Sequence, residues 1–256
     1  MPTEFNPVTV ARLSLQCLDL TSLNDGDKPA DITALCQRAQ SRFGPVAAVC
    51  VWPRFVAQAR QLLPATIRVA AVANFPAGAL DLDLSLNDVK AIIDAGGNEV
   101  DVVLPYRALM NGQIAECADF LNQVRAACRS LTLKVIIESG ELATAQRIAL
   151  GTQLAMAAGA DFVKTSTGKS AVSATTDAAR TMLREIGASG NGQVGFKASG
   201  GIRSVQDAAV YLALVVDELG NDALTPKRFR FGASGLLNDI EAVLGGHSAP
   251  LANSTY

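Results

Sequence analysis

Short apolar runs rich in Val, Ile and Ala alternate along this chain with longer segments of helical periodicity. This alternation is typical of parallel strands that are each followed by a helix covering the sheet. We place eight strands, at residues 15–20, 46–52, 68–74, 99–104, 132–138, 160–165, 193–198 and 228–232. Eight such strands close into a barrel, so we predict an α/β fold, a single-domain (β/α)8 TIM barrel over residues 1–256.

Residues typical of helix ends, found between the predicted strands, support the (β/α)8 prediction. A helix over 84–96 is predicted to begin at Ser85, with Asp88 three residues later as a carboxylate variant of the capping box, and to end at Gly96. A second helix, over 142–157, is predicted to stop before Gly159. From about residue 245 the chain becomes small and polar, and we expect this C-terminal tail to be mobile.

Composition excludes several classes of function. With 256 residues and 49% hydrophobic content the chain can bury a large core, and its net charge of −2 offers no broad cationic surface to nucleic acid. We find no leader-like N-terminus and no apolar stretch long enough to span a bilayer, so we expect no membrane partner and a cytoplasmic location. The five cysteines form no CxxC pair, and the one histidine, His247, is expected to be a solvated tail residue, so a metal site is not predicted.

Two lysines stand inside apolar runs, where a charged side chain is costly to bury. Lys164 lies in Phe-Val-Lys-Thr-Ser-Thr-Gly, and Lys197 lies in Gly-Phe-Lys-Ala-Ser-Gly-Gly. Burial and a neighbouring cation both disfavour the ammonium form, which leaves a neutral amine able to attack a carbonyl and form a Schiff base. A single lysine at a strand end could instead extend into solvent, but two lysines in the same setting weaken that alternative.

Asp101 lies in the run Glu-Val-Asp-Val-Val, where alternation places it on the same face as Glu99. A carboxylate in a strand core needs a partner, and strands of one barrel direct side chains into one central space, so Lys164 and Lys197 are candidate partners. The alternative is a buried ion pair that only orders the barrel centre. Glu138, at the end of its own strand, fits a similar structural role.

Glycine-rich turns follow the last three strands. Loops at this position, backed by helix N-termini, often bind phosphate through their backbone N–H groups. Because glycine commonly ends strands, each turn alone is weak evidence for a phosphate site, but the three turns together favour a phosphorylated substrate. The three turns are Thr167-Gly168-Lys169, Ser199-Gly200-Gly201 and Gly232-Ala233-Ser234-Gly235.

Motifs along nearly the whole chain carry a family resemblance. They are Leu18-Asp19-Leu20-Thr21, Leu23-Asn24-Asp25, Val49-Cys50-Val51-Trp52-Pro53-Arg54-Phe55, Asn74-Phe75-Pro76, Glu99-Val100-Asp101-Val102-Val103, Phe162-Val163-Lys164-Thr165-Ser166-Thr167-Gly168, Lys197-Ala198-Ser199-Gly200-Gly201-Ile202-Arg203 and Arg230-Phe231-Gly232-Ala233-Ser234. With these motifs in this order, the chain resembles the deoxyribose-phosphate aldolase family, Schiff-base aldolases on the (β/α)8 fold.

The resemblance implies a reaction and the roles of four residues. The reaction is the reversible, metal-independent cleavage of 2-deoxy-D-ribose 5-phosphate to acetaldehyde and D-glyceraldehyde 3-phosphate. Lys164 is implied to be the Schiff-base lysine, Lys197 the cation that lowers its pKa, and Asp101 the acid/base partner. Tyr256, on the tail, is implied to reach the active site and assist proton transfer at the enamine carbon, for which a phenol is suited.

The resemblance further implies a set of substrate-binding residues, no cofactor, and a homodimer. Two departures stand out: Trp52 replaces a common Tyr, and Gly235 replaces a second Ser found in some members, which removes one hydroxyl from the phosphate site. The implied substrate-binding residues are Asp19, Thr21, Leu23, Asp25, Cys50, Phe75, Thr167, Lys169, Gly200, Gly201, Arg203, Gly232, Ser234 and Gly235.

Two other functions remain open on the sequence. A transaldolase or a sugar-phosphate isomerase on the same barrel would also explain the glycine turns, although the two lysines argue against an isomerase. A metabolite-binding protein that kept the pocket without turnover is the non-enzymatic alternative, and Lys164, Lys197 and Asp101 argue against it. An assay of aldol cleavage separates these functions.

Overall fold

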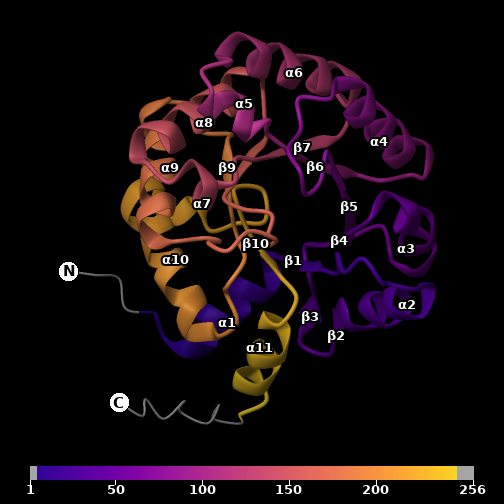
Figure 1. Ribbon diagram of the computed structural model, residues 1–256. Helices are drawn as coiled ribbons and strands as arrows, with labels where there is room; N and C mark the ends of the chain where they lie inside the picture. Colours follow the sequence, from indigo (N-terminus) through magenta and orange to yellow (C-terminus); the bar gives the residue numbers. More distant parts are fainter. Residues whose placement is uncertain (1–4, 247–256) are drawn as a thin grey trace.

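The centre of the molecule is a closed barrel of eight parallel strands with helices around it (Figure 1). The computed structural model describes residues 5–246. The barrel strands are β1 (Leu18–Thr21), β4 (Ala48–Val51), β5 (Arg68–Ala73), β6 (Glu99–Val103), β7 (Thr132–Ile136), β8 (Phe162–Lys164), β9 (Gly195–Ser199) and β10 (Phe229–Ala233). They follow chain order around the barrel, and β1 closes it by pairing with both β4 and β10. The predicted (β/α)8 fold is confirmed.

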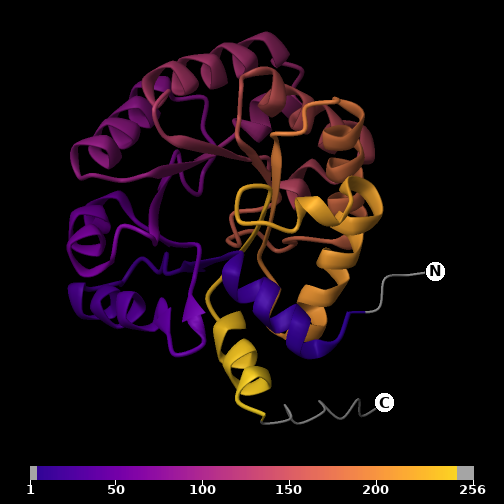
Figure 2. The same cartoon turned by 180° about the vertical axis from the view of Figure 1, so that it is seen from behind.

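Helices surround the strands, as the views from opposite sides show (Figures 1 and 2). They are α1 (Pro7–Gln16), α2 (Pro29–Arg38), α3 (Val56–Leu62), α4 (Leu82–Asp94), α5 (Tyr106–Met110), α6 (Ile114–Ala127), α7 (Ser139–Leu142), α8 (Ala145–Ala157), α9 (Thr176–Ala188), α10 (Val205–Leu219) and α11 (Leu236–Leu244). Shorter elements are the 3₁₀ turns η1 (Pro53–Phe55) and η2 (Asn221–Ala223) and the hairpin of β2 (Gln40–Ser41) and β3 (Gly44–Pro45). Within residues 5–246 no helix is long and apolar enough to cross a membrane.

The first predicted strand was placed too early. Residues 15–16 belong to α1, and β1 begins at Leu18. The helix forms because Asn6 caps it, accepting a hydrogen bond from the Val8 N–H at 2.8 Å, and because Pro7 occupies the first turn, where no N–H is needed. The helix packs against α10 and α11 (Figure 2).

The start of α4 also differs from its prediction. Its N-cap is Asp81, which accepts from the Leu84 N–H at 3.0 Å, whereas Ser85 lies inside the helix and donates to the Asp81 carbonyl. Asp88 makes no capping box, because its carboxylate accepts from the Asn74 N–H at 3.0 Å. The helix ends before Gly96, as predicted.

The helix predicted near 142–157 is α8 (Ala145–Ala157), which ends as predicted and begins three residues later. α7 ends at Leu142, Ala143 takes a left-handed φ of 60°, and α8 then starts with Thr144 as its cap. The strand before it is shorter than predicted, since β7 ends at Ile136 and Glu138 has a φ of 52°. These two residues turn the chain sharply at the mouth of the barrel, where the site lies.

The strands face two different environments. Outward side chains, such as Val49, Val69 and Val100, join the helices in one apolar core. The inward side chains of six of the strands are instead charged. The prediction of a mobile tail, together with His247 and Tyr256, concerns residues 247–256, which lie outside the described residues.

Candidate active site

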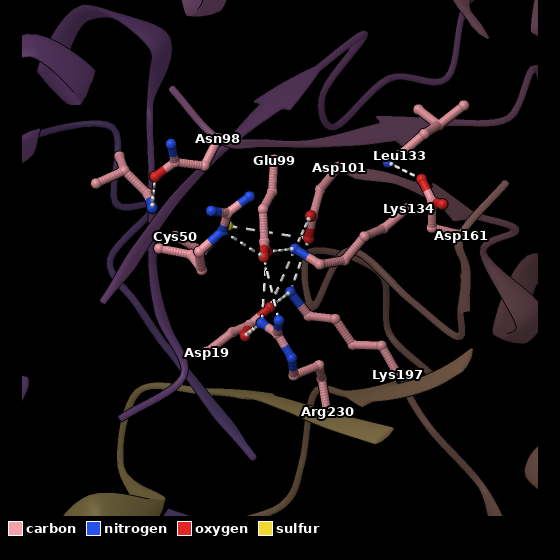
Figure 3. Close-up of polar contacts among 12 residues, drawn as sticks. Asp19, Cys50, Asn98, Glu99, Asp101, Leu133, Lys134, Asp161, Lys197 and Arg230 are labelled. Carbon is pink, nitrogen blue, oxygen red and sulfur yellow. Dashed lines mark hydrogen bonds and ion pairs between the residues drawn. The ribbon is translucent and has the colours of Figure 1, made fainter. Parts of the chain in front are cut away.

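Seven ionisable side chains fill much of the barrel interior, and we call them the interior charge cluster. Barrel interiors are ordinarily packed with branched aliphatic side chains, so this filling is unusual. Figure 3 shows six of them pointing toward one another from different strands. All seven are buried, with exposures of 5% or less. They are Asp19, Glu99, Asp101, Lys134, Lys164, Lys197 and Arg230.

Asp101 lies where three lysines meet. Its Oδ2 accepts from Lys164 Nζ at 2.8 Å and from Lys197 Nζ at 2.7 Å, and its Oδ1 accepts from Lys134 Nζ at 2.8 Å. Burial alone would raise the pKa of Asp101, but the three ammonium groups outweigh burial and hold the pKa well below its usual range. Asp101 is therefore an ionised acceptor that bridges the two lysines identified from the sequence.

Lys197 and Lys134 are held as cations. Lys197 Nζ contacts Asp19 Oδ2 at 2.5 Å in addition to Asp101, and Lys134 Nζ contacts Glu99, Asp101 and Asp19 at 2.5, 2.8 and 3.2 Å. Burial opposes the charged form of each lysine. The carboxylates outweigh burial, so the pKa of both ammonium groups is raised.

Lys164 differs from the other cations because it contacts a single carboxylate, that of Asp101. Burial lowers the pKa of Lys164, Asp101 opposes this effect, and the nearby charge of Lys197 lowers the pKa further. The net direction is downward. Lys164 is also the member of the cluster that lines the cavity at the open end of the barrel.

The net charge of the interior charge cluster also indicates that Lys164 is the group that loses its proton. Four cationic side chains face three carboxylates, so the cluster carries one positive charge in excess when every member is ionised. Excess charge in a buried site is relieved most easily by loss of one proton. Arg230, contacted by Asp19 and Glu99, stays protonated, and Lys134 and Lys197 have two or three carboxylate partners. The group that loses its proton most readily is Lys164.

A cavity of about 560 Å³ opens above Lys164 at the carboxyl ends of the strands. Most of the substrate-binding residues expected from the sequence are in its wall. The wall also contains six residues that were not expected: Ser22, Asn24, Gly168, Ser199, Ile202 and Ala233. The expected residues in the wall are Thr21, Leu23, Thr167, Lys169, Gly200, Gly201, Arg203, Gly232, Ser234 and Gly235.

The glycine turns leave backbone donors open to this cavity. Within residues 5–246, the N–H groups of Gly200, Gly201, Ser234 and Gly235 donate to no acceptor. Gly201 has a φ of 82°, which favours glycine, and a Cβ on Gly232 would lie 2.1 Å from Ser199 Oγ. Free N–H groups beside the cations Lys169 and Arg203 suit an anion.

Ser199 adds an unsatisfied hydroxyl to the cavity wall. Its Oγ is buried and has no hydrogen-bond partner among the described residues. A buried hydroxyl without a partner costs stability, and a polar ligand in the cavity would supply one. The sequence had not singled out this serine, because serine in a turn is common.

Glu138 holds the loop that carries Lys169. Its carboxylate accepts from Thr167 Oγ1 at 2.5 Å, from the Thr167 N–H at 3.3 Å and from Ser170 Oγ at 3.1 Å. The loop also packs closely on α7, since a Cβ on Gly140 would meet the Val172 carbonyl at 2.0 Å. Glu138 therefore has a structural role, since its hydrogen bonds hold the loop after β8 in place.

The opposite wall of the barrel mouth is apolar. Leu23, Cys50, Ala70 and Val72 form a small cluster separate from the main core, against which Trp52 and Phe75 pack. Cys50 Sγ lies 4.0 Å from Asp101 Oδ2. Burial, and then Asp101, raise the pKa of the Cys50 thiol, so the thiol stays protonated.

Four of the expected contact residues are absent from the wall of the 560 Å³ cavity, and Cys50, in the apolar cluster, is one of them. Asp25 is exposed and absent from its wall, and Asp27 instead orders this loop by accepting from Ser22 Oγ at 2.7 Å. Phe75 stacks edge-on against Trp52 and lines a separate cavity of about 180 Å³. Asp19 lies below the cavity, in the interior charge cluster.

Lys134 and Arg230 are the members of the site that sequence reasoning missed. Lys134 stands inside an apolar strand as Lys164 does, so the same signal was present. Arg230 was quoted only within a motif, and its partner Asp19 is distant in sequence. Within residues 5–246 no group of three or more His, Cys, Asp or Glu side chains is arranged to hold a metal ion. The arrangement supplies a buried amine of lowered pKa, a bridging carboxylate and an anion-binding rim.

Comparison with known proteins agrees with this chemistry. Residues 13–240 match the model of the DeoC/LacD family aldolases. The deoxyribose-phosphate aldolase of Agrobacterium fabrum is 46% identical over 253 residues, which cover 98% of this chain and 97% of that protein. A crystal structure from Coccidioides immitis superposes with a TM-score of 0.78 at 30% identity, covering 90% of this chain and 85% of that one. The tetrameric deoxyribose phosphate aldolase of Aeropyrum pernix, 23% identical with a TM-score of 0.73 over 93% of this chain and 92% of that one, shares the fold.

Proposed function

The chain belongs to the DeoC/LacD family of aldolases, and we propose on that premise that it reversibly cleaves 2-deoxy-D-ribose 5-phosphate through a Schiff base on Lys164. The products are acetaldehyde and D-glyceraldehyde 3-phosphate. One observation carries the assignment to Lys164: it is the lysine of the interior charge cluster with a single carboxylate partner, and it lines the cavity.

In the cleavage direction, neutral Lys164 Nζ attacks the C1 aldehyde carbon, and loss of water gives an iminium. The iminium draws electrons from the C2–C3 bond, which breaks as a base removes the proton of the C3 hydroxyl. Glyceraldehyde 3-phosphate leaves, and the remaining enamine takes a proton at its terminal carbon. Hydrolysis then releases acetaldehyde and restores the amine.

Asp101 is proposed as the group that moves these protons. Its Oδ2 is 2.8 Å from Lys164 Nζ and 2.7 Å from Lys197 Nζ, so it is near the carbon atoms bonded to the amine. Lys197 is proposed to keep Asp101 ionised and Lys164 neutral. Tyr256, outside the described residues, is proposed to assist the same proton transfer.

The phosphate group is proposed to bind at the rim formed by the glycine turns. The N–H groups of Gly200 and Gly201 and the side chains of Lys169 and Arg203, none of which has an acceptor or carboxylate partner within residues 5–246, supply the donors and the charge. Ser199 Oγ, which lacks a partner within residues 5–246, is placed to accept or donate a hydrogen bond to a sugar hydroxyl.

Trapping of the Schiff base tests the proposal. Sodium borohydride added with acetaldehyde should leave one ethyl group on Lys164, located by mass spectrometry of the digested protein. Lys164→Met should remove the adduct, and Lys169→Met, which changes a lysine of the same cavity, should retain it. An adduct on Lys169 or Lys197 would overturn the assignment.

Two further properties are proposed. A cytoplasmic location is supported by five cysteines that are buried and free of disulfides. A homodimer is supported by apolar side chains of α4 that are exposed, Leu84 at 50% and Ile93 at 39%. Light scattering after size-exclusion chromatography measures the mass of the assembly.

A further inference from the structure

A second and larger cavity opens at the opposite end of the barrel. It has a volume of about 790 Å³ and lies between α1, the β2–β3 hairpin and the amino ends of the strands. It shares no lining residue with the active-site cavity. Its charged lining residues are Arg12, Arg68, Glu99, Asp161, Lys227 and Arg230.

The floor of this amino-end cavity is the lower part of the interior charge cluster. Glu99 and Arg230 are 1% and 5% exposed, and Arg230 Nη2 donates to Glu99 Oε1 at 3.1 Å. Arg230 also donates to Asp19, and its guanidinium lies 5.5 Å from the ring centre of Phe162. The floor therefore consists of groups that already neutralise one another.

The rim, in contrast, has cations without partners. Within residues 5–246, the side chains of Arg12 and Lys227 make neither a hydrogen bond nor an ion pair. Arg68 Nε forms a longer ion pair with Glu99 Oε1, at 3.7 Å. The other carboxylate of the cavity, Asp161, is neutralised by Arg125 at 2.9 Å. Arg12 and Lys227 therefore bring positive charge to the cavity that no carboxylate of residues 5–246 offsets.

This excess contrasts with the net charge of −2 of the whole chain. Several exposed arginines elsewhere are paired with carboxylates, as Arg38 is with Glu241 and Arg184 with Glu218. The active-site cavity resembles the amino-end cavity, because its cations Lys169 and Arg203 have no carboxylate partner among the described residues and face the proposed phosphate. Unpaired cations that converge on a recessed volume recognise anions.

We propose that the amino-end cavity binds a small polyanion, a molecule with at least two phosphate or carboxylate groups. Arg12, on α1, Arg68, at the start of β5, and Lys227, before β10, reach it from three separate elements. The volume accommodates a small metabolite, and the hydroxyl of Thr132 and the amide of Gln193 add neutral hydrogen-bonding groups to the wall.

Calorimetric titration with inorganic pyrophosphate tests the proposal on the full-length protein. Wild type should show two classes of site, one at each end of the barrel. The double variant Arg12→Gln/Lys227→Gln should lose the amino-end site, with affinity reduced about tenfold or more, while its kcat and KM for deoxyribose 5-phosphate stay unchanged. Lys169→Met should weaken only the other site.

Arg147→Gln is the matched control, since Arg147 is an exposed arginine that lines none of the described cavities. It should leave both classes of site intact. Citrate, added as a competitor, separates phosphate chemistry from carboxylate chemistry at the amino-end cavity. A single class of site that Lys169→Met removes, or unchanged binding in the Arg12→Gln/Lys227→Gln variant, would overturn the proposal, whatever the aldolase assay shows.

Discussion

The barrel interior has two halves of opposite character. On β4 and β5 the inward side chains are Cys50, Ala70 and Val72, and they form an apolar half with Leu23. Each of the other six strands directs at least one member of the interior charge cluster inward. The register joins the halves directly, because Val72 is paired with Asp101 and Ala70 with Glu99.

The two halves of the barrel interior have different roles: the apolar half excludes water, and the charged half supplies the reactive groups. The apolar half excludes water from one side of Asp101, and low local polarity strengthens every interaction of the charges beside it. The charged half gains little stability from its ion pairs, because desolvation of buried charges offsets their attraction. What it supplies is a set of amines with different pKa values, produced by different numbers of carboxylate partners.

The largest effect is expected from Lys164→Met. We expect aldol cleavage to fall by more than about 10⁴-fold, because the nucleophile is lost. The same change removes the excess cation of the cluster, so the midpoint of thermal unfolding should stay the same or rise. Steady-state kinetics and calorimetric melts measure the two effects. A melting temperature well below wild type would show that Lys164 is a structural cation.

Lys197→Met should reduce activity less than Lys164→Met, and in a pH-dependent manner. Without Lys197 the pKa of Lys164 rises, because a nearby cation is lost and Asp101 has one partner fewer. Only the neutral amine attacks the carbonyl. The acidic limb of the pH profile of kcat/KM should therefore move to higher pH, and activity should partly return in alkaline buffer. An unchanged profile would contradict this electrostatic role.

Stability should distinguish the two halves most clearly. Lys134→Met leaves Glu99, Asp101 and Asp19 with one cation fewer, and we expect a loss of about 3–5 kcal/mol in the free energy of unfolding. Val72→Ala, the counterpart in the apolar half, should cost about 2 kcal/mol through lost burial and a small cavity. Urea titrations of both variants provide the comparison. Equal losses would show that the charged half is no more sensitive than an ordinary core.

Glu138→Ala should give the smallest of these effects, confined to the phosphate end. Loss of the hydrogen bonds to Thr167 and Ser170 frees the loop that carries Lys169. KM for deoxyribose 5-phosphate should rise about tenfold, equivalent to about 1.4 kcal/mol, while kcat/KM for unphosphorylated deoxyribose changes little. Glu141→Ala, an exposed glutamate of α7, is the control. Equal losses on both substrates would indicate a general loss of structure.

Much of this architecture was predictable from local patterns. The barrel strands, the inward direction of Asp101 and the two lysines follow from alternation and from the positions of turns. Some helix boundaries were less accurate, because capping was assigned to the wrong residues. Asp88, for example, bonds the Asn74 N–H rather than capping its own helix. The first strand was placed too early because its predicted range, 15–20, included the last two residues of helix α1.

The sequence by itself determined the barrel, the glycine turns and the positions of two of the three buried amines, Lys164 and Lys197, because these depend on periodicity and on residues close together in the chain. Only the tertiary structure decided which amine loses its proton. Lys134, Lys164 and Lys197 have similar sequence environments, and they differ in how many of Asp19, Glu99 and Asp101 each one reaches. Lys197 and Asp19 are 178 residues apart in the chain. A pKa is set by the charges that surround a group in space, and closure of the barrel between β1 and β10 brought these charges together.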